Sequence, residues 1–66
     1  MSGVYLGELL DCIPRRDEVR IYSAYNSDTV YWTGSAGQTT LPPKFYGYEV
    51  TKIAASGGVI EIGVKK

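Results

Sequence analysis

The sequence predicts an α+β fold in which a short N-terminal helix packs on a small antiparallel sheet of about four strands arranged as two hairpins. Three observations support this prediction. Apolar residues near the N-terminus recur with the period of a helix, later segments alternate apolar and polar residues in runs of strand length, and turn-forming residues separate those runs. With 66 residues the chain is expected to form a single domain, residues 1–66.

The predicted helix occupies YLGELLDCI, residues 5–13. Four apolar side chains share one helical face: Leu6, Leu9, Leu10 and Ile13. Pro14 ends the helix, because the residue before a proline avoids helical backbone angles. Gly7 costs up to about 1 kcal/mol relative to alanine inside a helix, so packing rather than propensity is expected to hold this element.

The first hairpin is predicted around YNSD, residues 25–28, which is polar and turn-prone. In the preceding DEVRIYSA, Val19 and Ile21 alternate with Arg20 and Tyr22, so the two pairs face opposite sides of the sheet. TVYWTG follows the turn and is typical of a strand, because β-branched and aromatic residues dominate it.

The second hairpin is predicted from YEVTKIAA and VIEIGVKK, which flank the glycine turn SGG. Val50 and Ile53 lie three positions apart and so break strict alternation. A bulge near Thr51 or Lys52 would place both on the core face. The inward residues of the last strand are expected to be Ile60, Ile62 and Val64.

The segment between the hairpins is expected to be irregular, because glycine and proline interrupt SAGQTTLPPKFYG. Pro42 and Pro43 favour a single additional helical turn near residues 42–47.

The composition limits how so small a domain can be stabilised. A chain of this length buries only about 60% of the surface that its unfolded form exposes, so it needs additional support. Cys12 is the single cysteine and histidine is absent, which excludes an intrachain disulfide and a structural zinc site. Oligomerisation remains, so a homo-oligomer is predicted, with no metal and no cofactor.

Charge and hydropathy narrow the range of partners. Seven basic residues balance seven acidic ones, whereas a binder of duplex nucleic acid is usually basic, so that partner is not expected. No stretch approaches the length of a membrane span, and no basic segment precedes an apolar one at the N-terminus. A cytoplasmic location away from membranes is therefore predicted, with Cys12 reduced.

The sequence argues against an enzyme. Without histidine, acid–base catalysis would fall to carboxylates, lysine or tyrosine, and the carboxylates lie at turns, caps or exposed helix positions. Cys12 has no histidine to activate it and lies beside the apolar stripe near the helix C-terminus, where the helix dipole disfavours a thiolate. A half-buried, unreactive thiol is predicted.

The succession LGELLDCI, DEVRIYSA, YWTGSA, LPPKFYGYEVTKI and SGGVIEIGV resembles a class of very short proteins carried in accessory gene clusters of tailed phages and prophages. The resemblance covers nearly the whole chain but contains no catalytic motif, so it transfers no functional residue. It implies a setting in the host cell cytoplasm. Some phage proteins of this size counter host defence there, either by binding a host protein or by sequestering a nucleotide signal. Residues 39–50 depart from the pattern, with two prolines and three aromatics where an acidic helix is usual, which marks this segment as specialised.

Residues 20–34 hold three of the six tyrosines and the single tryptophan. Arg20 shares a strand face with Tyr22, and the next strand brings Tyr31 or Trp32 opposite them. Because these two point to opposite faces only one can join, and Trp32 is predicted to do so. An arginine beside aromatic rings can stack on a base and hold a phosphate. The alternative is a cation–π contact that only packs side chains together on the surface of the sheet.

A second basic position follows the helix. Arg16, beside Arg15, is suited to bidentate phosphate binding, although pairing with Asp17 and Glu18 or simple solvation is the alternative. The predicted ligand-binding residues are therefore Arg16, Arg20, Tyr22, Tyr31 and Trp32.

Two classes of function remain. In the first, a homo-oligomer sequesters a small phosphate-bearing ligand of nucleotide type as a phage counter-defence protein. In the second, an inhibitor docks its aromatic sheet face on a host protein, since tyrosine, tryptophan and arginine dominate such interfaces. The balanced charge favours the first, because a nucleotide needs only one or two local arginines. An assembly factor without a ligand also remains open.

Overall fold

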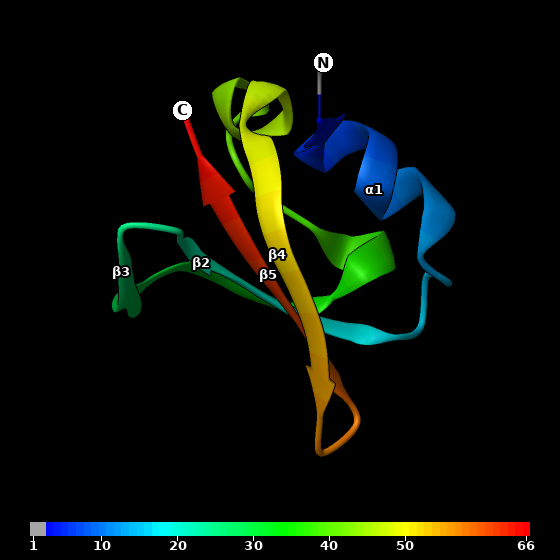
Figure 1. Cartoon of the computed structure of the whole chain (residues 1–66). Coiled ribbons are helices and arrows are strands. Elements are labelled where there is room, and N and C mark those ends of the chain that lie inside the picture. The colour runs from blue at the N-terminus through cyan, green and yellow to red at the C-terminus, as the bar shows by residue number, and fades with distance from the viewer. Residues whose placement is uncertain (1–2) are drawn as a thin grey trace.

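The computed structural model describes residues 3–66 and has two layers, a five-stranded sheet with short helices against one of its faces (Figure 1). The elements are β1 (Val4–Tyr5), α1 (Leu6–Cys12), β2 (Glu18–Ser23), β3 (Asn26–Ser35), the 3₁₀ helices η1 (Ala36–Gln38) and η2 (Pro43–Gly47), β4 (Glu49–Ser56) and β5 (Val59–Lys65). The predicted α+β class is confirmed, and η2 is the predicted additional helical turn.

The strands lie in the order β1-β4-β5-β2-β3. Both predicted hairpins are present, since β3 pairs antiparallel with β2 and β5 pairs antiparallel with β4. The sheet differs from the predicted antiparallel one in two respects: β1 adds a strand beside the start of β4, and β2 lies parallel to β5. A strand of two residues has no readable period, and how two hairpins pair is decided by tertiary packing.

The parallel pairing of β2 with β5 forms the centre of the core. Ile21 lies opposite Ile62 in this pairing, and both side chains are fully buried. The buried cluster comprises Leu6, Val19, Ile21, Leu41, Ile62 and Val64. Its members come from the sheet, from α1 and from the segment between η1 and η2, so the helical layer and the sheet share one core, and the predicted inward faces of β2 and β5 are confirmed.

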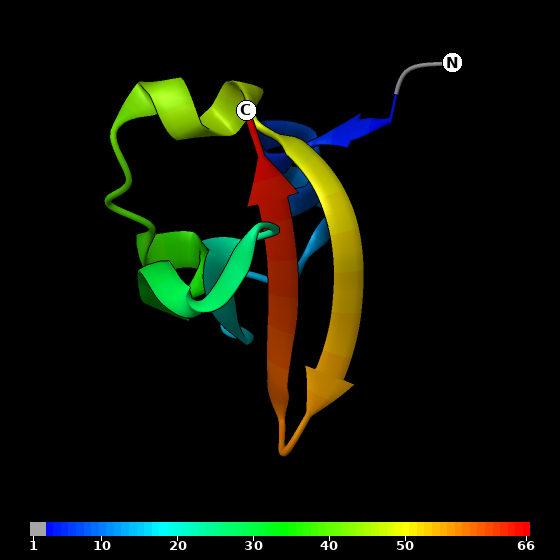
Figure 2. The ribbon, with the colours of Figure 1, turned by 60° about the vertical axis from the view of Figure 1, so that its left-hand side comes forward.

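The tip of the β4–β5 hairpin is a turn of two glycines. Gly57 and Gly58 have φ angles of 58° and 83°, which the tight turns of two-residue hairpins require and which only glycine adopts without strain. In Figures 1 and 2 this tip extends beyond the helical layer. No helix of the described chain therefore covers either face of the outer half of the β4–β5 hairpin.

The predicted bulge in β4 is confirmed. The register shifts between Val50 and Lys52, so that Val50 lies opposite Val64 and Ile53 lies opposite Ile62. Both β4 side chains consequently lie on the core face. Because α1 does not reach the hairpin tip, however, Ile53 remains 55% exposed.

The β2–β3 hairpin turns earlier than predicted. Its turn falls at residues 24–25, and β3 already begins at Asn26. Tyr22 pairs with Val30 whereas Ser23 pairs with Asn26, so residues 27–29 have no partner in β2. The Asn26 side chain accepts a hydrogen bond from the backbone N–H of residue 28 at 3.0 Å, which favours a local bend inside the strand.

Candidate functional site

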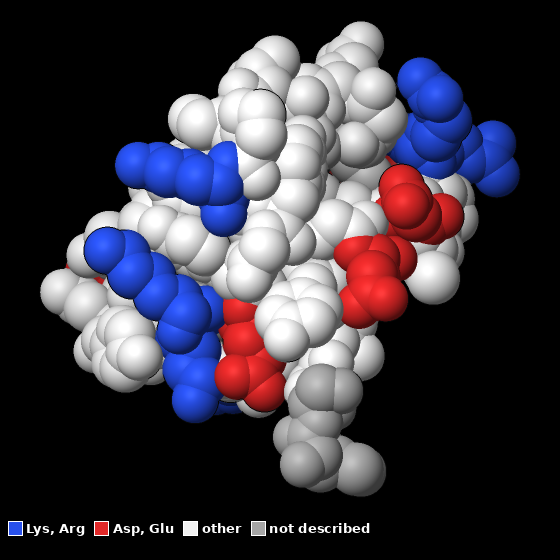
Figure 3. Space-filling model, turned by 90° about the horizontal axis from the view of Figure 1, so that it is seen from above, with Lys and Arg blue, Asp and Glu red and all other residues white. Residues whose placement is uncertain are grey.

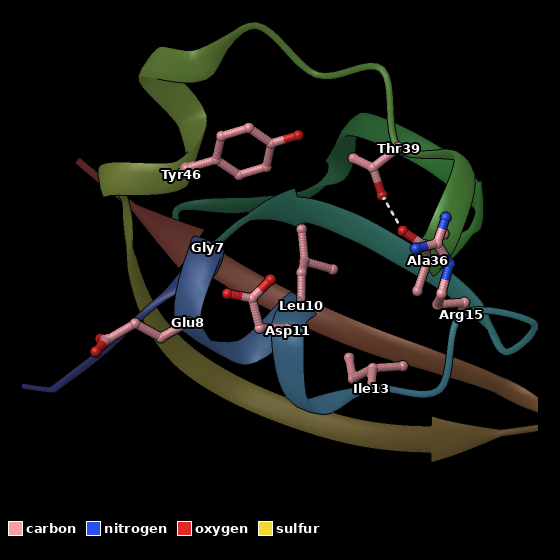
Figure 4. A pocket seen from close by; sticks show the side chains of 10 residues that line it. Gly7, Glu8, Leu10, Asp11, Ile13, Arg15, Ala36, Thr39 and Tyr46 are labelled. Atoms are coloured by element: carbon pink, nitrogen blue, oxygen red, sulfur yellow. Dashed lines mark hydrogen bonds between the residues drawn. The ribbon is translucent and has the colours of Figure 1, made fainter.

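A groove of about 700 Å³ lies between α1 and the segment that contains η1 and η2 (Figure 4). Its volume lies within the range of roughly 300–1,000 Å³ that is usual for small-molecule sites. Its lining includes Glu8, Leu10, Asp11, Ile13, Arg15, Ala36, Thr39 and Tyr46. The groove therefore brings together residues 7–15 and residues 36–46, which the whole β2–β3 hairpin separates in the sequence.

One wall exists because Gly7 lets α1 approach η2 closely. A Cβ atom at Gly7 would lie only 3.1 Å from the Cβ of Tyr46, and the backbone N–H of Leu6 donates to the carbonyl of Tyr48 at 2.9 Å. In this orientation α1 presents Asp11 to the groove, below the ring of Tyr46 (Figure 4). The glycine that weakens the helix thus has a packing role.

The opposite wall is formed by η1, which is held against the segment after α1. The N–H groups of Ala36 and Gly37 donate to the carbonyls of Asp17 and Arg15, each at 2.8 Å. A Cβ atom at Gly37 would lie 2.7 Å from the Cβ of Arg15, so this approach needs glycine. Thr39 Oγ1 donates to the Ala36 carbonyl at 2.7 Å (Figure 4). Together these bonds fix the backbone of Arg15 at one end of the groove.

The two ends of the groove carry opposite charge. The carboxylates of Glu8 and Asp11 lie on the side of Tyr46, whereas Arg15 lies beside Ala36 at the other end (Figure 4). Seen from above, charged side chains of both signs border an uncharged centre of the molecule (Figure 3). The groove is thus suited to a ligand whose two ends differ in charge and whose middle is less polar.

Arg16 borders a second hollow of about 390 Å³, which also contains Arg15 and Gly37. The one ion pair within residues 3–66 joins Lys65 to Glu49 at 3.8 Å. The pairing of these arginines with Asp17 and Glu18, which the sequence left open, is therefore not made. Arg15, which lines both hollows, and Arg16, which lines the second, thus have no carboxylate partner among the described residues.

The predicted neighbours Arg20 and Tyr22 do share the outer face of the sheet. The Cζ atom of Arg20 lies 5.2 Å from the ring centroid of Tyr22, and its Nη2 donates to the carbonyl of Ser27 at 3.0 Å. Tyr22 is only 7% exposed, because its ring packs on Gly63 in the neighbouring strand. These contacts match the alternative in which the two side chains pack on the surface of the sheet and stabilise the fold.

Trp32 does not join them. It lies opposite Ile21 on the core face, and its Nε1 donates to Thr40 Oγ1 at 3.1 Å. Tyr31 packs on Phe45 of η2 with ring centroids 5.1 Å apart. The prediction that Trp32 shares the outer face is wrong, because a register shift after Ile21 leaves Tyr31 without a direct partner and changes the alternation.

Cys12 also differs from its prediction. Its side chain is exposed, not half-buried. The helix ends at this residue, and the neighbouring Ile13 is the side chain that packs against the core. Of the predicted binding residues, Arg16 lines one of these two hollows, and Arg20, Tyr22, Tyr31 and Trp32 line neither.

Sequence reasoning missed Asp11, Arg15, Thr39 and Tyr46 as members of one site. A signal for Tyr46 was present, because residues 39–50 concentrate two prolines and three aromatic residues. Gly37 is a second signal in retrospect, since a glycine outside a turn often marks a close approach of two backbones. Neither signal says which segment lies opposite.

Within residues 3–66 no three histidine, cysteine or acidic side chains come together as metal ligands, and no helix there has the length and apolar character needed to cross a membrane. No protein-family model, curated protein or solved structure matches this chain. A function must therefore be inferred from the groove and its surroundings.

Proposed function

We propose that this protein is a small, non-enzymatic binding protein whose groove sequesters a phosphate-bearing ligand of nucleotide type. The observation that carries the proposal is the groove itself: a ligand-sized concavity with Arg15 at one end and with a tyrosine ring and a carboxylate at the other. Arg15 also lines the smaller hollow to which Arg16 belongs, so this end of the groove adjoins a second arginine. The groove replaces the outer sheet face as the binding site, because Arg20 and Tyr22 have partners within the fold.

The arginines hold the phosphate. Arg15 and Arg16 are exposed and have no carboxylate partner among residues 3–66, so no internal ion pair has to be broken before they bind an anion. A guanidinium donates two parallel hydrogen bonds to phosphate oxygens, and such charge-assisted bonds are about twice as strong as neutral ones. The backbone bonds around Gly37 keep this end of the groove in place.

The other end holds the nucleoside part. The half-buried ring of Tyr46 offers a surface for a base, and stacking on an aromatic ring contributes about 1–3 kcal/mol per base. Leu10 and Ile13 supply an apolar floor. Asp11 accepts hydrogen bonds from ribose hydroxyls or an exocyclic amino group. A phosphate would be repelled by this carboxylate, so the ligand binds in one orientation.

The resemblance to short phage proteins supplies the biological setting of the proposal. A protein that binds a nucleotide signal without transforming it lowers the free concentration of that signal, and this would counter a host defence that the signal activates. The proposed location is the host cell cytoplasm, and the proposed active form is a homo-oligomer.

Isothermal titration calorimetry tests the proposal with inorganic phosphate, adenosine mono- and diphosphate and a cyclic dinucleotide as probes. Wild-type protein is expected to bind at least one nucleotide more tightly than phosphate alone. The double variant Arg15→Ala/Arg16→Ala is expected to weaken that affinity about tenfold to a hundredfold. Lys66→Ala, which removes a positive charge at an exposed position outside the groove, is the matched control and is expected to bind normally.

Native mass spectrometry of protein purified from its host complements the titration, because it shows a co-purifying small molecule directly. The proposal fails if no nucleotide binds, or if a nucleotide binds equally well to the double arginine variant. A co-purifying host protein with no bound nucleotide would favour the inhibitor alternative instead.

A further inference from the structure

The outer edge of β4 is unpaired along most of its length within the described chain. β1 contacts this edge only through Val4, opposite Val50, and Tyr5, opposite Glu49. No strand among residues 3–66 continues the sheet beyond β4 alongside residues 51–56, and every one of those residues is exposed. Unpaired backbone N–H and C=O groups at such an edge are a template for a further strand.

We propose that this edge pairs with the same edge of a second copy, so that two β4 strands run antiparallel and two sheets join into one. The proposal rests on the homo-oligomer named above and identifies its interface. An antiparallel edge is self-complementary, because a two-fold axis perpendicular to the sheet matches the donors of one strand with the acceptors of the other.

The hairpin turn identifies the backbone groups that face the free edge. A two-residue turn at Gly57–Gly58 makes Ser56 and Val59 the closing hydrogen-bonded pair. Since bonding alternates along an antiparallel strand, Ala54 bonds to β5 and the N–H and C=O groups of Ile53 and Ala55 point outward. None of residues 51–56 is a proline, so each keeps its donor.

The two-fold axis also limits the register. It preserves the faces of the sheet, so Ile53, which is on the core face, must lie opposite a core-face residue of the other copy. Placing Ile53 opposite Ile53 of the partner subunit pairs residues 51–55 of the two strands, and the pairing ends before Val50, where β1 occupies the edge. This register brings two large apolar side chains together. Each of them is 55% exposed in the isolated chain, and pairing would remove much of that surface from water.

This register also produces charge complementarity on the outer face. Lys52 then lies opposite Ala54 of the partner subunit, and Ala54 is itself opposite Glu61 in β5. Lys52 and the partner subunit's Glu61 are thus two strand spacings apart, about 9.6 Å. The small alanine between them leaves room for both side chains to meet. Neither residue takes part in an ion pair within residues 3–66, and the two-fold axis forms the contact twice.

Sedimentation equilibrium in the micromolar range tests the interface without any ligand. Wild-type protein is expected to form dimers. Lys52→Glu is expected to raise the dimer dissociation constant about tenfold or more, because repulsion replaces attraction at two symmetric sites. The double variant Lys52→Glu/Glu61→Lys is expected to restore dimerisation, since the pair is re-formed with its signs exchanged. Lys66→Glu makes the same charge change at an exposed C-terminal position and serves as the control.

Ala55→Pro provides an independent test. It removes an N–H that faces the free edge and leaves the hydrogen bonds to β5 intact, so circular dichroism should show a folded protein and sedimentation a monomer. A wild-type monomer would overturn both the interface and the homo-oligomer. An oligomer that is insensitive to Lys52→Glu and Ala55→Pro would overturn the interface alone. Neither result decides nucleotide binding, because the calorimetric test of the groove uses different residues.

Discussion

The outer face of β2 and the groove beside α1 both present arginine and tyrosine side chains, but they differ in whether the arginines already have partners within the fold. Arg20 contacts the ring of Tyr22 and a backbone carbonyl, and Tyr22 is buried. At the groove and the hollow beside it, Arg15 and Arg16 have no ion-pair partner among the described residues. The comparison teaches that side chains whose partners lie within the fold stabilise it, whereas those without partners are available to a ligand.

The largest expected effect lies on the outer face. Tyr22→Ala should cost about 3–5 kcal/mol, because truncating a buried aromatic leaves a cavity over Gly63. That is a large share of the roughly 3–10 kcal/mol available to a chain of this size. Thermal denaturation followed by circular dichroism measures the loss. Tyr25→Ala removes a tyrosine that is 78% exposed and should change stability by no more than about 0.5 kcal/mol. Equal melting temperatures for the two variants would contradict this account of the outer face.

An intermediate effect is expected at the wall of the groove. Gly37→Ala would place a Cβ atom 2.7 Å from the Cβ of Arg15, and the resulting shift should cost about 1–3 kcal/mol. It should also weaken nucleotide binding, because Arg15 is displaced. Gly47→Ala is the matched control, since no atom from another part of the fold lies within 4 Å of the added Cβ. Urea denaturation compares the two, and equal midpoints would show that η1 does not depend on close approach at Gly37.

A smaller effect is expected for Arg20→Ala. The substitution removes a partly buried cation–π contact and a hydrogen bond to a carbonyl, together about 1–2 kcal/mol. For a domain of this size, 1 kcal/mol lowers the melting temperature by about 4–8 °C. Differential scanning calorimetry measures the shift. An unchanged melting temperature would mean that Arg20 has no structural role and would restore it as a candidate for ligand binding.

The smallest effect is expected for Cys12→Ala. Because the side chain is exposed at the end of α1, its removal should change the free energy of unfolding by less than about 0.5 kcal/mol. Nucleotide binding should remain as in the wild type. A substantial loss of stability in chemical denaturation would show that the thiol is packed, as the apolar stripe of the sequence had suggested.

Local patterns predicted much of the fold. The alternation of apolar and polar residues identified the inward faces of β2 and β5. The two adjacent glycines predicted the turn between β4 and β5, and the three-residue spacing of Val50 and Ile53 predicted the bulge in β4. Each of these features is determined by residues close together in the chain. The parallel pairing of β2 with β5 and the short strand β1 were missed, because both depend on contacts between distant segments.

The site was less predictable than the fold. The concentration of aromatic residues in β2 and β3 suggested an exposed binding face, but a register shift at Tyr31 turns Trp32 toward the core and Tyr31 toward η2. The groove depends on Gly37 meeting Arg15, two residues from different elements. Sequence alone indicates neither contact, although it did single out Arg16 and the segment that contains Tyr46.

The most direct test of the comparison measures two quantities on the same two variants: the melting temperature, and the calorimetric affinity for whichever probe nucleotide binds wild-type protein most tightly. We expect Arg20→Ala to lower the melting temperature and to leave the affinity within about twofold. For Arg15→Ala/Arg16→Ala we expect an unchanged melting temperature and an affinity reduced about tenfold or more. Loss of affinity in Arg20→Ala, with normal binding by the double variant, would contradict the account and return the ligand site to the outer face of the sheet.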